Sequence, residues 1–192
     1  MRIFVAGASA VIGIRLVPLL VAAGHDVAGM TRSPGKMAVL KELGAEPVLC
    51  DVYDTSVLRA AVVEFAPDAV IDQLTDLPDD LAKISELSAR AERMLREGTG
   101  NLLDAAAAAR ADRFLAQSIA WELPGERGVT YHEHERAALD AGGVVIRYGQ
   151  LYGPDTYYET ELPPSPRINV SEAARRTVPL LEAPPGIVEL VE

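Results

Sequence analysis

Residues 5–13 read VAGASAVIG, and this stretch decides the fold class. It follows a short apolar run that is typical of a β-strand and opens a segment with helical spacing of its apolar residues. The small residues Gly7, Ala10 and Gly13 are three positions apart, as in a turn that holds a dinucleotide pyrophosphate between strand and helix. In such turns the first glycine makes the bend, the middle one lets backbone approach the phosphates, and the last lets the helix pack on the strand.

Ala10 stands where the middle glycine is expected, and two outcomes are open. If this position needs a positive φ, alanine there costs about 1–2 kcal/mol. If the backbone is helical, the extra methyl group is only a steric matter and the loop can shift. Either way, the start of the following helix offers unpaired N–H groups and a partial positive charge to phosphates. The competing interpretation is an ordinary strand–helix turn that merely retains small residues.

Short β-rich runs alternate with longer helical segments along the rest of the chain. Unbroken apolar strands that alternate with helices predict an α/β fold, a doubly wound parallel sheet with helices on both faces. Ser33 is the predicted N-cap of the second helix. Residues 152–167, rich in Pro, Tyr and acidic side chains, are predicted to form a loop or lid. The predicted strands are 2–6, 26–30, 47–50, 69–73, 114–117, 144–147 and 187–191, and the predicted helices are 11–23, 34–43, 55–65, 79–110 (interrupted near 98–100) and 171–181.

Composition limits the function classes. A chain of 192 residues with 49% hydrophobic residues is expected to form one domain, residues 1–192, with a substantial core. The net charge of −10 argues against nucleic acid and anionic membranes as partners. The single cysteine, Cys50, excludes an intramolecular disulfide, so a reducing, cytoplasmic location is expected. No signal-peptide layout and no apolar stretch long enough for a membrane span is present in the sequence.

The end of the second predicted strand bears on cofactor choice. An acidic side chain there would bind the adenosine ribose 2′-hydroxyl, whereas an arginine accommodates a 2′-phosphate. The sequence has Thr31, Arg32 and Ser33 at this place and no acid. Because a guanidinium makes strong paired contacts to phosphate, NADP(H) is favoured over NAD(H). The alternative is that Arg32 is a solvated surface side chain.

Five stretches together resemble the NAD-dependent epimerase/dehydratase family, the extended or atypical branch of the short-chain dehydrogenase/reductase superfamily. They are FVAGASAVIG (4–13), LCDVYD (49–54), VIDQLTDL (70–77), EGTGNLLDAAAAA (97–109) and VIRYGQLYGP (145–154). Residues 168–181 and 186–192 also look like the family's late helix and the strand after it. The resemblance covers nearly the whole chain and implies a Rossmann-type sheet with the cofactor across its carboxyl edge.

The resemblance also assigns roles by position. It places one group of residues at the pyrophosphate, one at the ribose phosphate, one beside adenine and one on the ribose and nicotinamide side. Ser118 matches the family's catalytic or substrate-binding Ser/Thr. The four cofactor groups are Gly7, Ser9, Ala10, Val11, Ile12 and Gly13; Thr31, Arg32 and Ser33; Asp51 and Val52; and Gln73, Leu74, Thr75 and Tyr148, the last with the turn 152–154.

The family's proton donor is the tyrosine of a YxxxK motif, whose lysine lowers the pKa of the tyrosine. No lysine follows Lys83 here, so this motif is absent. Tyr131 is the tyrosine nearest the expected place, and Glu135, four residues on, would raise rather than lower the pKa of a phenol. The register is open, since Tyr131 also fits the place of the missing lysine.

Two histidines lie between Tyr131 and Glu135. His132 and His134 are two positions apart and do not share a helical face, so no metal site is predicted. A general acid or base role for Tyr131 or His132 is open beside the plainer interpretation of a polar helix start at the surface for both histidines.

The substrate lobe is expected to be much reduced, because family members carry more chain between the YGP turn and the late helix. A small or flat substrate is therefore expected, or one shared with a partner subunit, and the resemblance allows a homodimer. Three functions are open. The first is an atypical NADP(H)-dependent oxidoreductase or epimerase-like enzyme acting on a small carbonyl or hydroxyl compound. The others are a non-catalytic NADPH-binding sensor or scaffold, and a non-redox isomerase or cyclase.

Overall fold

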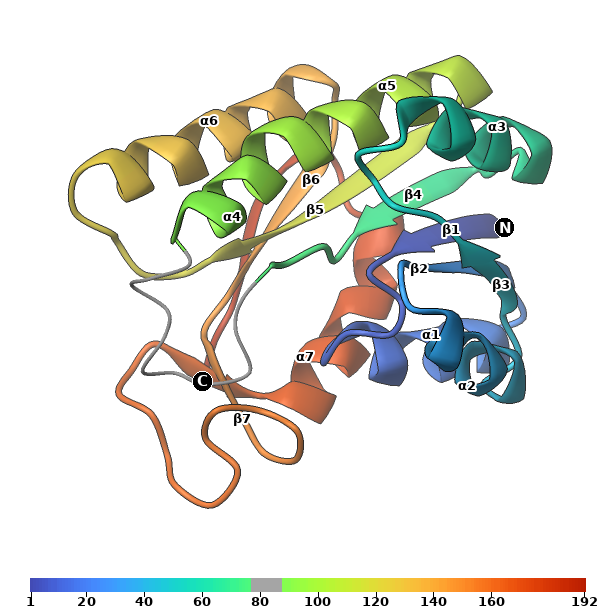
Figure 1. The fold of residues 1–192 in the computed structure, drawn as a ribbon. Coiled ribbons are helices and arrows are strands. Elements are labelled where there is room, and N and C mark those ends of the chain that lie inside the picture. The colour runs from blue at the N-terminus through green and yellow to red at the C-terminus, as the bar shows by residue number, and fades with distance from the viewer. Residues whose placement is uncertain (77–87) are drawn as a thin grey trace.

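The computed structural model describes residues 1–76 and 88–192, which form a parallel sheet covered by helices on both faces (Figure 1). The strand order is β3-β2-β1-β4-β5-β6-β9, and every neighbouring pair is parallel. Parallel pairing puts all carboxyl ends at one edge, where ligands of such sheets bind. The strands are β1 (Arg2–Ala6), β2 (Asp26–Thr31), β3 (Glu46–Leu49), β4 (Ala69–Asp72), β5 (Arg113–Ile119), β6 (Val144–Tyr148) and β9 (Gly186–Leu190).

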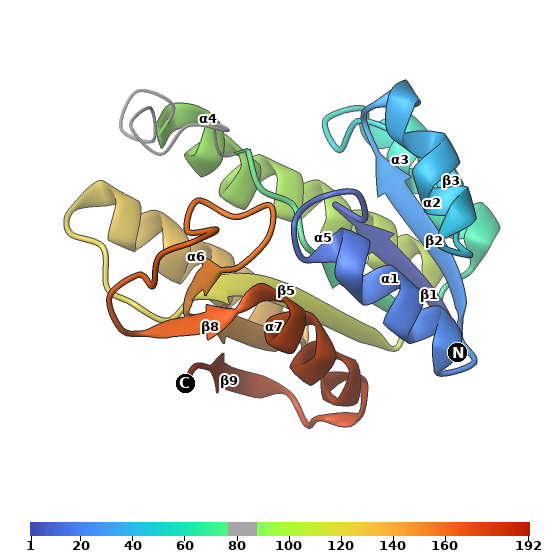
Figure 2. The same cartoon turned by 90° about the horizontal axis from the view of Figure 1, so that it is seen from below.

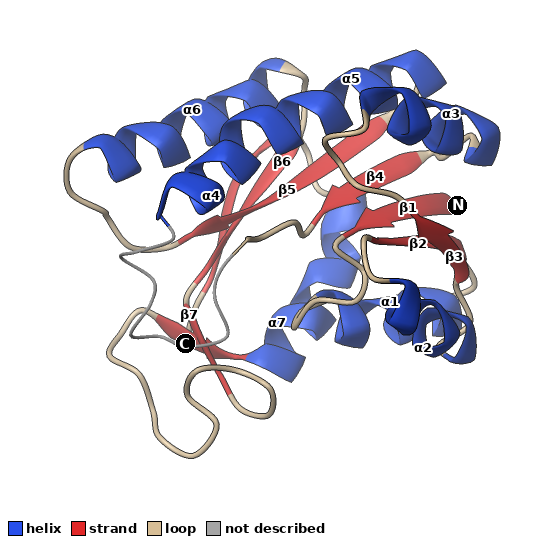
Figure 3. Ribbon diagram, in the orientation of Figure 1, coloured by secondary structure: helices blue, strands red, loops and turns tan. Residues whose placement is uncertain are grey.

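The helices divide between the two faces, as the secondary-structure colouring also shows (Figure 3). On one face lie α3 (Thr55–Phe65), α5 (Thr99–Ala109) and α6 (Glu126–Asp140). On the other lie α1 (Gly13–Ala22), α2 (Met37–Glu42) and α7 (Val170–Thr177), with α1 and α7 side by side (Figure 2). The predicted doubly wound fold is therefore confirmed.

Alternation along β1 explains why the strand has no polar face. Ile3 and Val5 enter the core under α1 and α7, whereas Phe4 and Ala6 enter the core under α3 and α5, and all four are fully buried. A strand buried on both sides must be apolar at every position. The two cores thus fix β1 at the centre of the sheet and the turn after it at the carboxyl edge.

Several element boundaries differ from the prediction. The first helix begins at Gly13 rather than residue 11, because the preceding residues form the turn. The second predicted helix is a short 3₁₀ segment, η1 (Pro34–Lys36), followed by α2, and the side chain of Ser33 caps neither. The late helix is α7 followed by the 3₁₀ segment η4 (Val178–Glu182).

The long predicted helix 79–110 begins outside the described residues. From Ser88 onward the chain is helical, as α4 (Ser88–Arg93), the π-helical η3 (Met94–Gly98) and α5. The expected interruption near residues 98–100 thus corresponds to the π-helical turn just before Thr99. Helix α6 was not predicted as an element, because its polar sequence has little apolar periodicity.

The predicted loop 152–167 contains more order than expected. Strand β7 (Gln150–Tyr152) pairs in parallel with β8 (Arg167–Asn169), so the segment is a closed excursion from the end of β6. Its first turn is attached to the first helix, since Arg15 Nη2 donates to the Pro154 carbonyl oxygen and to Asp155 Oδ2, both at 2.7 Å. The excursion is thereby held beside the turn that precedes α1.

Candidate functional site

The turn between β1 and α1 needs glycine at two of its three small positions. Gly7 has φ +77°, and a side chain there would overlap the backbone carbonyl of Gln73. A Cβ atom at Gly13 would overlap the carbonyl oxygen of Gly7, so the start of the helix would be displaced from the strand. These close approaches are the physical reason for the first and last glycines of the sequence motif.

Ala10 causes no backbone strain, because it is not among the described residues with a positive φ. Its N–H donates to the Gly7 carbonyl oxygen at 3.0 Å, and its own carbonyl accepts the N–H of Ile14 at 2.9 Å. The second of the two outcomes considered for Ala10 therefore applies. Its methyl group is a matter of space alone.

The start of α1 is free to bind an anion. Within the described part of the chain, the N–H groups of Val11, Ile12 and Gly13 have no hydrogen-bonding partner, and no acidic residue lies in the first helical turn. Lys36 Nζ lies 3.2 Å from the Ser9 carbonyl oxygen and brings a positive charge to the same turn. The residues present therefore fit a pyrophosphate.

The predicted ribose-side residues come together with this turn. Ser9 Oγ lies 2.9 Å from Thr31 Oγ1, which also accepts the N–H of Ser33 at 3.2 Å. Arg32 Nη2 donates to Asp76 Oδ1 at 2.9 Å. Arg90 on α4 grips the same carboxylate, with Nε to Oδ2 at 3.1 Å and Nη2 to Oδ1 at 2.9 Å.

Asp76 is the buried member of this group, with 8% of its side chain exposed, whereas Arg32 and Arg90 are 51% and 55% exposed. Burial raises the pKa of the Asp76 carboxyl, but the hydrogen bonds and charges of Arg32 and Arg90 outweigh burial and hold that pKa below its usual value. An acidic side chain thus does lie beside Arg32. It comes from the loop after β4 instead of from the end of β2, where such an acid would be expected.

The predicted adenine side is on the loop between β3 and α3, which contacts α5. Asp51 is exposed and accepts the N–H of Tyr53 at 3.0 Å, whereas Val52 is buried and its carbonyl oxygen accepts from Asn101 Nδ2 at 3.1 Å. The Arg93 guanidinium lies over the Tyr53 ring, 3.8 Å from its centroid.

The predicted nicotinamide side is a wall fixed by hydrogen bonds. Gln73 Nε2 donates to the Tyr148 hydroxyl at 3.1 Å, and that hydroxyl lies 2.7 Å from Thr177 Oγ1 on α7. Burial raises the pKa of Tyr148 to about 12, so its phenol stays protonated. Leu74 is held through Asp72 Oδ1 and Gln117 Nε2, and Thr75 beside it is exposed.

The two predicted catalytic residues lie in different surroundings. Ser118 is buried, and its Oγ donates to Glu135 Oε1 at 2.6 Å. Arg147 donates to both Glu135 oxygens, from Nε at 2.8 Å and from Nη2 at 2.6 Å. Burial raises the pKa of Glu135, but Arg147 and Ser118 outweigh it and lower that pKa, so Glu135 is a carboxylate at neutral pH.

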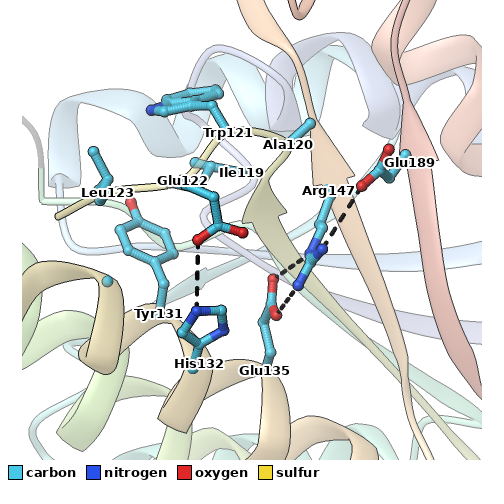
Figure 4. Close-up of a pocket in the computed structure, with 11 residues that line it drawn as sticks. Ile119, Ala120, Trp121, Glu122, Leu123, Tyr131, His132, Glu135, Arg147 and Glu189 are labelled. Atoms are coloured by element: carbon cyan, nitrogen blue, oxygen red, sulfur yellow. Dashed lines mark hydrogen bonds and ion pairs between the residues drawn. The ribbon is translucent and has the colours of Figure 1, made fainter.

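Glu135 and Tyr131 line a small pocket of about 70 Å³ at the carboxyl ends of β5 and β6 (Figure 4). Burial raises the pKa of the Tyr131 phenol, and the charge of Arg127 opposes that rise only in part. His132 on the same helix is exposed and lies 3.7 Å from Glu122. The lining residues are Ile119, Ala120, Trp121, Glu122, Leu123, Gly128, Tyr131, His132, Glu135, Arg147 and Glu189.

A second group of buried polar residues joins four elements, β4, β5, α5 and α6. His134 Nδ1 lies 3.1 Å from Thr99 Oγ1, and Thr99 donates to Asp72 Oδ2 at 2.8 Å. His134 Nε2 lies 2.8 Å from the Gln117 carbonyl oxygen. The surface interpretation is therefore right for His132 but wrong for His134, which is 2% exposed.

The sequence does not predict three groups of interacting side chains. They are Glu135 with Arg147, Asp76 with Arg90, and Asp72 with Thr99 and His134. The pairs of charged residues are 12 and 14 positions apart, and the Asp72–His134 group spans four elements. A buried acid such as Asp72 within an apolar strand run is the one signal that the sequence offered for any of them. Across residues 1–76 and 88–192, no cluster of His, Cys, Asp and Glu is placed to hold a metal ion, and no helix there has the length and apolar character of a membrane span.

Comparisons with known proteins agree with this geometry. The NAD(P)H-binding family matches residues 7–143. A Streptomyces protein named 3-diazoavenalumate denitrifying reductase is 35% identical over 182 residues, covering 82% of this chain. The chain spans 59% of the length of that reductase.

Two solved structures share the fold. The UDP-glucose 4-epimerase of Thermus thermophilus in complex with NAD superposes with a TM-score of 0.82 at 19% identity, covering 100% of this chain and 78% of the epimerase. The UDP-glucose 4-epimerase of Thermotoga maritima with UDP-glucose gives 0.81 at 17% identity, covering 100% and 77%. Identities this low show the architecture alone.

The family match begins at Gly7 and includes the turn before α1, Arg32 and β5, the parts that carry the cofactor geometry described above. The chain therefore belongs to the NAD(P)H-binding family.

Proposed function

We propose that this protein is an NADP(H)-dependent oxidoreductase acting on a small carbonyl or hydroxyl compound. The observation that carries the proposal is the free start of α1, with unpaired N–H groups and no acid in its first turn. Arg32 and Lys36 add positive charge beside it and support NADP(H) over NAD(H). Bound NADPH supplies a hydride, and the protein supplies position and electrostatics.

Each group of residues has a part in this proposal. The β1–α1 turn binds the pyrophosphate, and the wall of Gln73 and Leu74 orients the nicotinamide end. The pocket beside Glu135 receives the substrate, and its volume of about 70 Å³ supports a small one. Tyr131 or solvent provides the proton. Ser118 is buried, so it acts through Glu135.

A second candidate substrate class follows from the reductase relative, whose name describes a diazo compound that is denitrified. A diazonium group that is replaced by hydride leaves as N₂, and this reaction needs no proton from the protein. Burial raises the pKa of Tyr131 and no lysine lies beside it in the sequence, so its phenol is a weak proton donor. A hydride acceptor that needs no proton is therefore suited to this pocket. Diazonium compounds therefore belong in any substrate panel.

The non-catalytic alternative, an NADPH-binding sensor or scaffold, is favoured by the same missing lysine and by the burial of Ser118. A non-redox isomerase or cyclase would use Tyr131, His132 and Glu135 in the pocket. A homodimer and a cytoplasmic location remain expectations from the sequence.

Calorimetric titration with NADPH and with NADH is the first experiment. We expect NADPH to bind more tightly than NADH. Arg32→Ala should weaken the affinity for NADPH by about tenfold or more and leave the affinity for NADH nearly unchanged. Equal loss for both would reject the 2′-phosphate role of Arg32. Absence of binding at millimolar concentration would reject both cofactor-dependent functions.

Turnover separates the remaining alternatives. NADPH oxidation is followed at 340 nm with a panel of small carbonyl, hydroxyl and diazonium compounds. With an active substrate, Tyr131→Phe should lower kcat by about 10²-fold or more if the phenol donates the proton, and change little if solvent does. Cofactor binding without turnover on the whole panel would favour the sensor.

A further inference from the structure

The carboxylate of Asp76 lies between two arginines that come from different elements. We call Arg32, Asp76 and Arg90 the Asp76 clamp. Arg32 follows the end of β2, Asp76 lies on the loop after β4, and Arg90 belongs to α4. Two guanidinium groups and one carboxylate leave the Asp76 clamp with one excess positive charge.

The exposure of the three side chains shows where that charge is available. Asp76 is buried beneath the arginines, whose side chains are 51% and 55% exposed. A guanidinium has five N–H donors. Arg32 donates one hydrogen bond to Asp76 and Arg90 donates two, so both half-exposed side chains keep N–H donors for a ligand. The Asp76 clamp is thus an anion site with one internal anion already in place.

Its position is that of the adenosine ribose. The end of the second strand of such a sheet meets this ribose, and Arg32 is the residue that follows it. Ser9, Thr31 and Lys36 connect the same place to the phosphate turn. The charge that faces the ribose hydroxyls is therefore the sum of Arg32, Arg90 and Asp76, and Arg32 alone does not set it.

We propose that the Asp76 clamp is the 2′-phosphate site, in which Arg90 is a second phosphate-binding residue and Asp76 a built-in competitor. This inference rests on the NADP(H) preference proposed above. A phosphate group offers more charge and more acceptor oxygens than a carboxylate, so it takes the arginine donors. Asp76 keeps both arginines paired when no 2′-phosphate is bound, and its repulsion of the phosphate limits the preference for NADP(H) over NAD(H).

Adenosine 2′,5′-bisphosphate and AMP are the probes, because they differ only in the 2′-phosphate. Their affinities are measured by calorimetry at one fixed salt concentration for the wild type, Arg90→Gln and Asp76→Asn. We expect Arg90→Gln to weaken the bisphosphate by about tenfold and AMP by less than about twofold. Asp76→Asn should strengthen the bisphosphate by about threefold or more. Arg136→Gln, at an exposed arginine on α6, is the control and should change neither.

Circular dichroism and thermal unfolding check that each variant folds. Asp76→Asn leaves two unpaired arginines side by side, which can destabilise the fold. The Arg90→Gln/Asp76→Asn double variant avoids this and provides a second measurement. We expect the double variant to bind the bisphosphate more tightly than the Arg90→Gln single variant does. The inference would be overturned if Arg90→Gln weakened the binding of both probes equally. It would also be overturned if Asp76→Asn weakened bisphosphate binding both in the wild-type background and in the Arg90→Gln background. Neither result would reject cofactor binding itself. If wild-type protein binds neither NADPH nor NADH, the proposed function itself fails.

Discussion

At the scale of single residues, the turn after β1 separates glycines that the backbone requires from a position that tolerates a side chain. Gly7 has a positive φ and lies against Gln73, and Gly13 lies against the carbonyl oxygen of Gly7. Ala10 lies between them in an unstrained conformation. The missing middle glycine therefore leaves the turn intact, and its effect is confined to the space above Ala10.

Gly7→Ala should therefore lower the free energy of unfolding by about 1–2 kcal/mol or more, from its left-handed conformation alone. Gly7→Ala should also weaken NADPH binding, because the new methyl group would overlap the Gln73 backbone and force the turn to shift. Ala10→Gly is the matched control and should change stability by about 1 kcal/mol or less. Urea unfolding and calorimetry measure both. Equal effects of the two substitutions would contradict this account of the turn.

At the scale of elements, Asp72, Thr99 and His134 bind β4, α5 and α6 together, and His134 also contacts the Gln117 carbonyl of β5. A carbonyl oxygen only accepts, so His134 Nε2 carries a proton. Thr99 donates its one proton to Asp72, so Nδ1 donates as well, unless Asp72 itself holds a proton and the chain of donors reverses. In both arrangements the buried pair has no net charge. Burial raises the pKa of Asp72, opposed by the charge of His134 and the hydrogen bonds of Leu74 and Thr99.

Replacing His134 should therefore destabilise the junction of these elements. His134→Gln is expected to lower the free energy of unfolding by about 1–3 kcal/mol, because it disrupts the buried hydrogen bonds to Thr99 and to the Gln117 carbonyl oxygen. His132→Gln, two residues earlier and exposed, should change it by less than about 0.5 kcal/mol. Urea unfolding of both variants at pH 7 is the measurement. A cost at His132 as large as at His134 would argue against the bridge.

At the scale of the whole molecule, Tyr148 connects two strands of the sheet to a helix of the α1/α7 face. It lies on β6, receives Gln73 from the end of β4 and contacts Thr177 on α7. Burial raises its pKa from 10.0 to about 12, although the Thr177 and Gln73 hydrogen bonds oppose the rise. The fold therefore holds this phenol neutral in a pH range where the unfolded chain would ionise.

Stability should consequently fall at alkaline pH. Between pH 10 and about 12 the unfolded chain binds fewer protons than the folded one, so the stabilisation is present below pH 10 and lost as pH rises through the folded pKa. A shift of this size corresponds to roughly 3 kcal/mol. Cys50 acts in the same direction, since burial raises the pKa of its thiol from 9.0 to about 11.

Urea unfolding from pH 8 to 12 measures the effect. Tyr148→Phe should be less stable than wild type at pH 8, because Gln73 and Thr177 lose a partner, and should show a shallower decline above pH 10. A decline of the same steepness in both proteins would show that Tyr148 is not its source.

The sequence predicts an element well where the spacing of its apolar residues agrees with the capping and turn residues at its ends. Helix α3 matches its predicted bounds because Asp54 caps it and its apolar residues repeat with helical spacing. Helix α6 escaped because its buried residues are Gly128, Thr130, His134, Glu135 and Ala138, which carry no apolar stripe. Segment 152–167 was predicted to be loop, and the pairing of β7 with β8 depends on a partner 17 residues away.

By itself the sequence determined the doubly wound sheet, the glycine turn at its edge and the family of the chain. These follow from local properties: strands buried on both faces must be apolar, and a backbone that approaches another at Gly7 and Gly13 excludes side chains. The tertiary structure alone decided the electrostatics of the site. Asp76 reaches Arg32 across 44 positions, and Arg147 fixes Glu135 across 12. Such pairings depend on which strand ends meet at the carboxyl edge, and no local pattern in a single sequence encodes them.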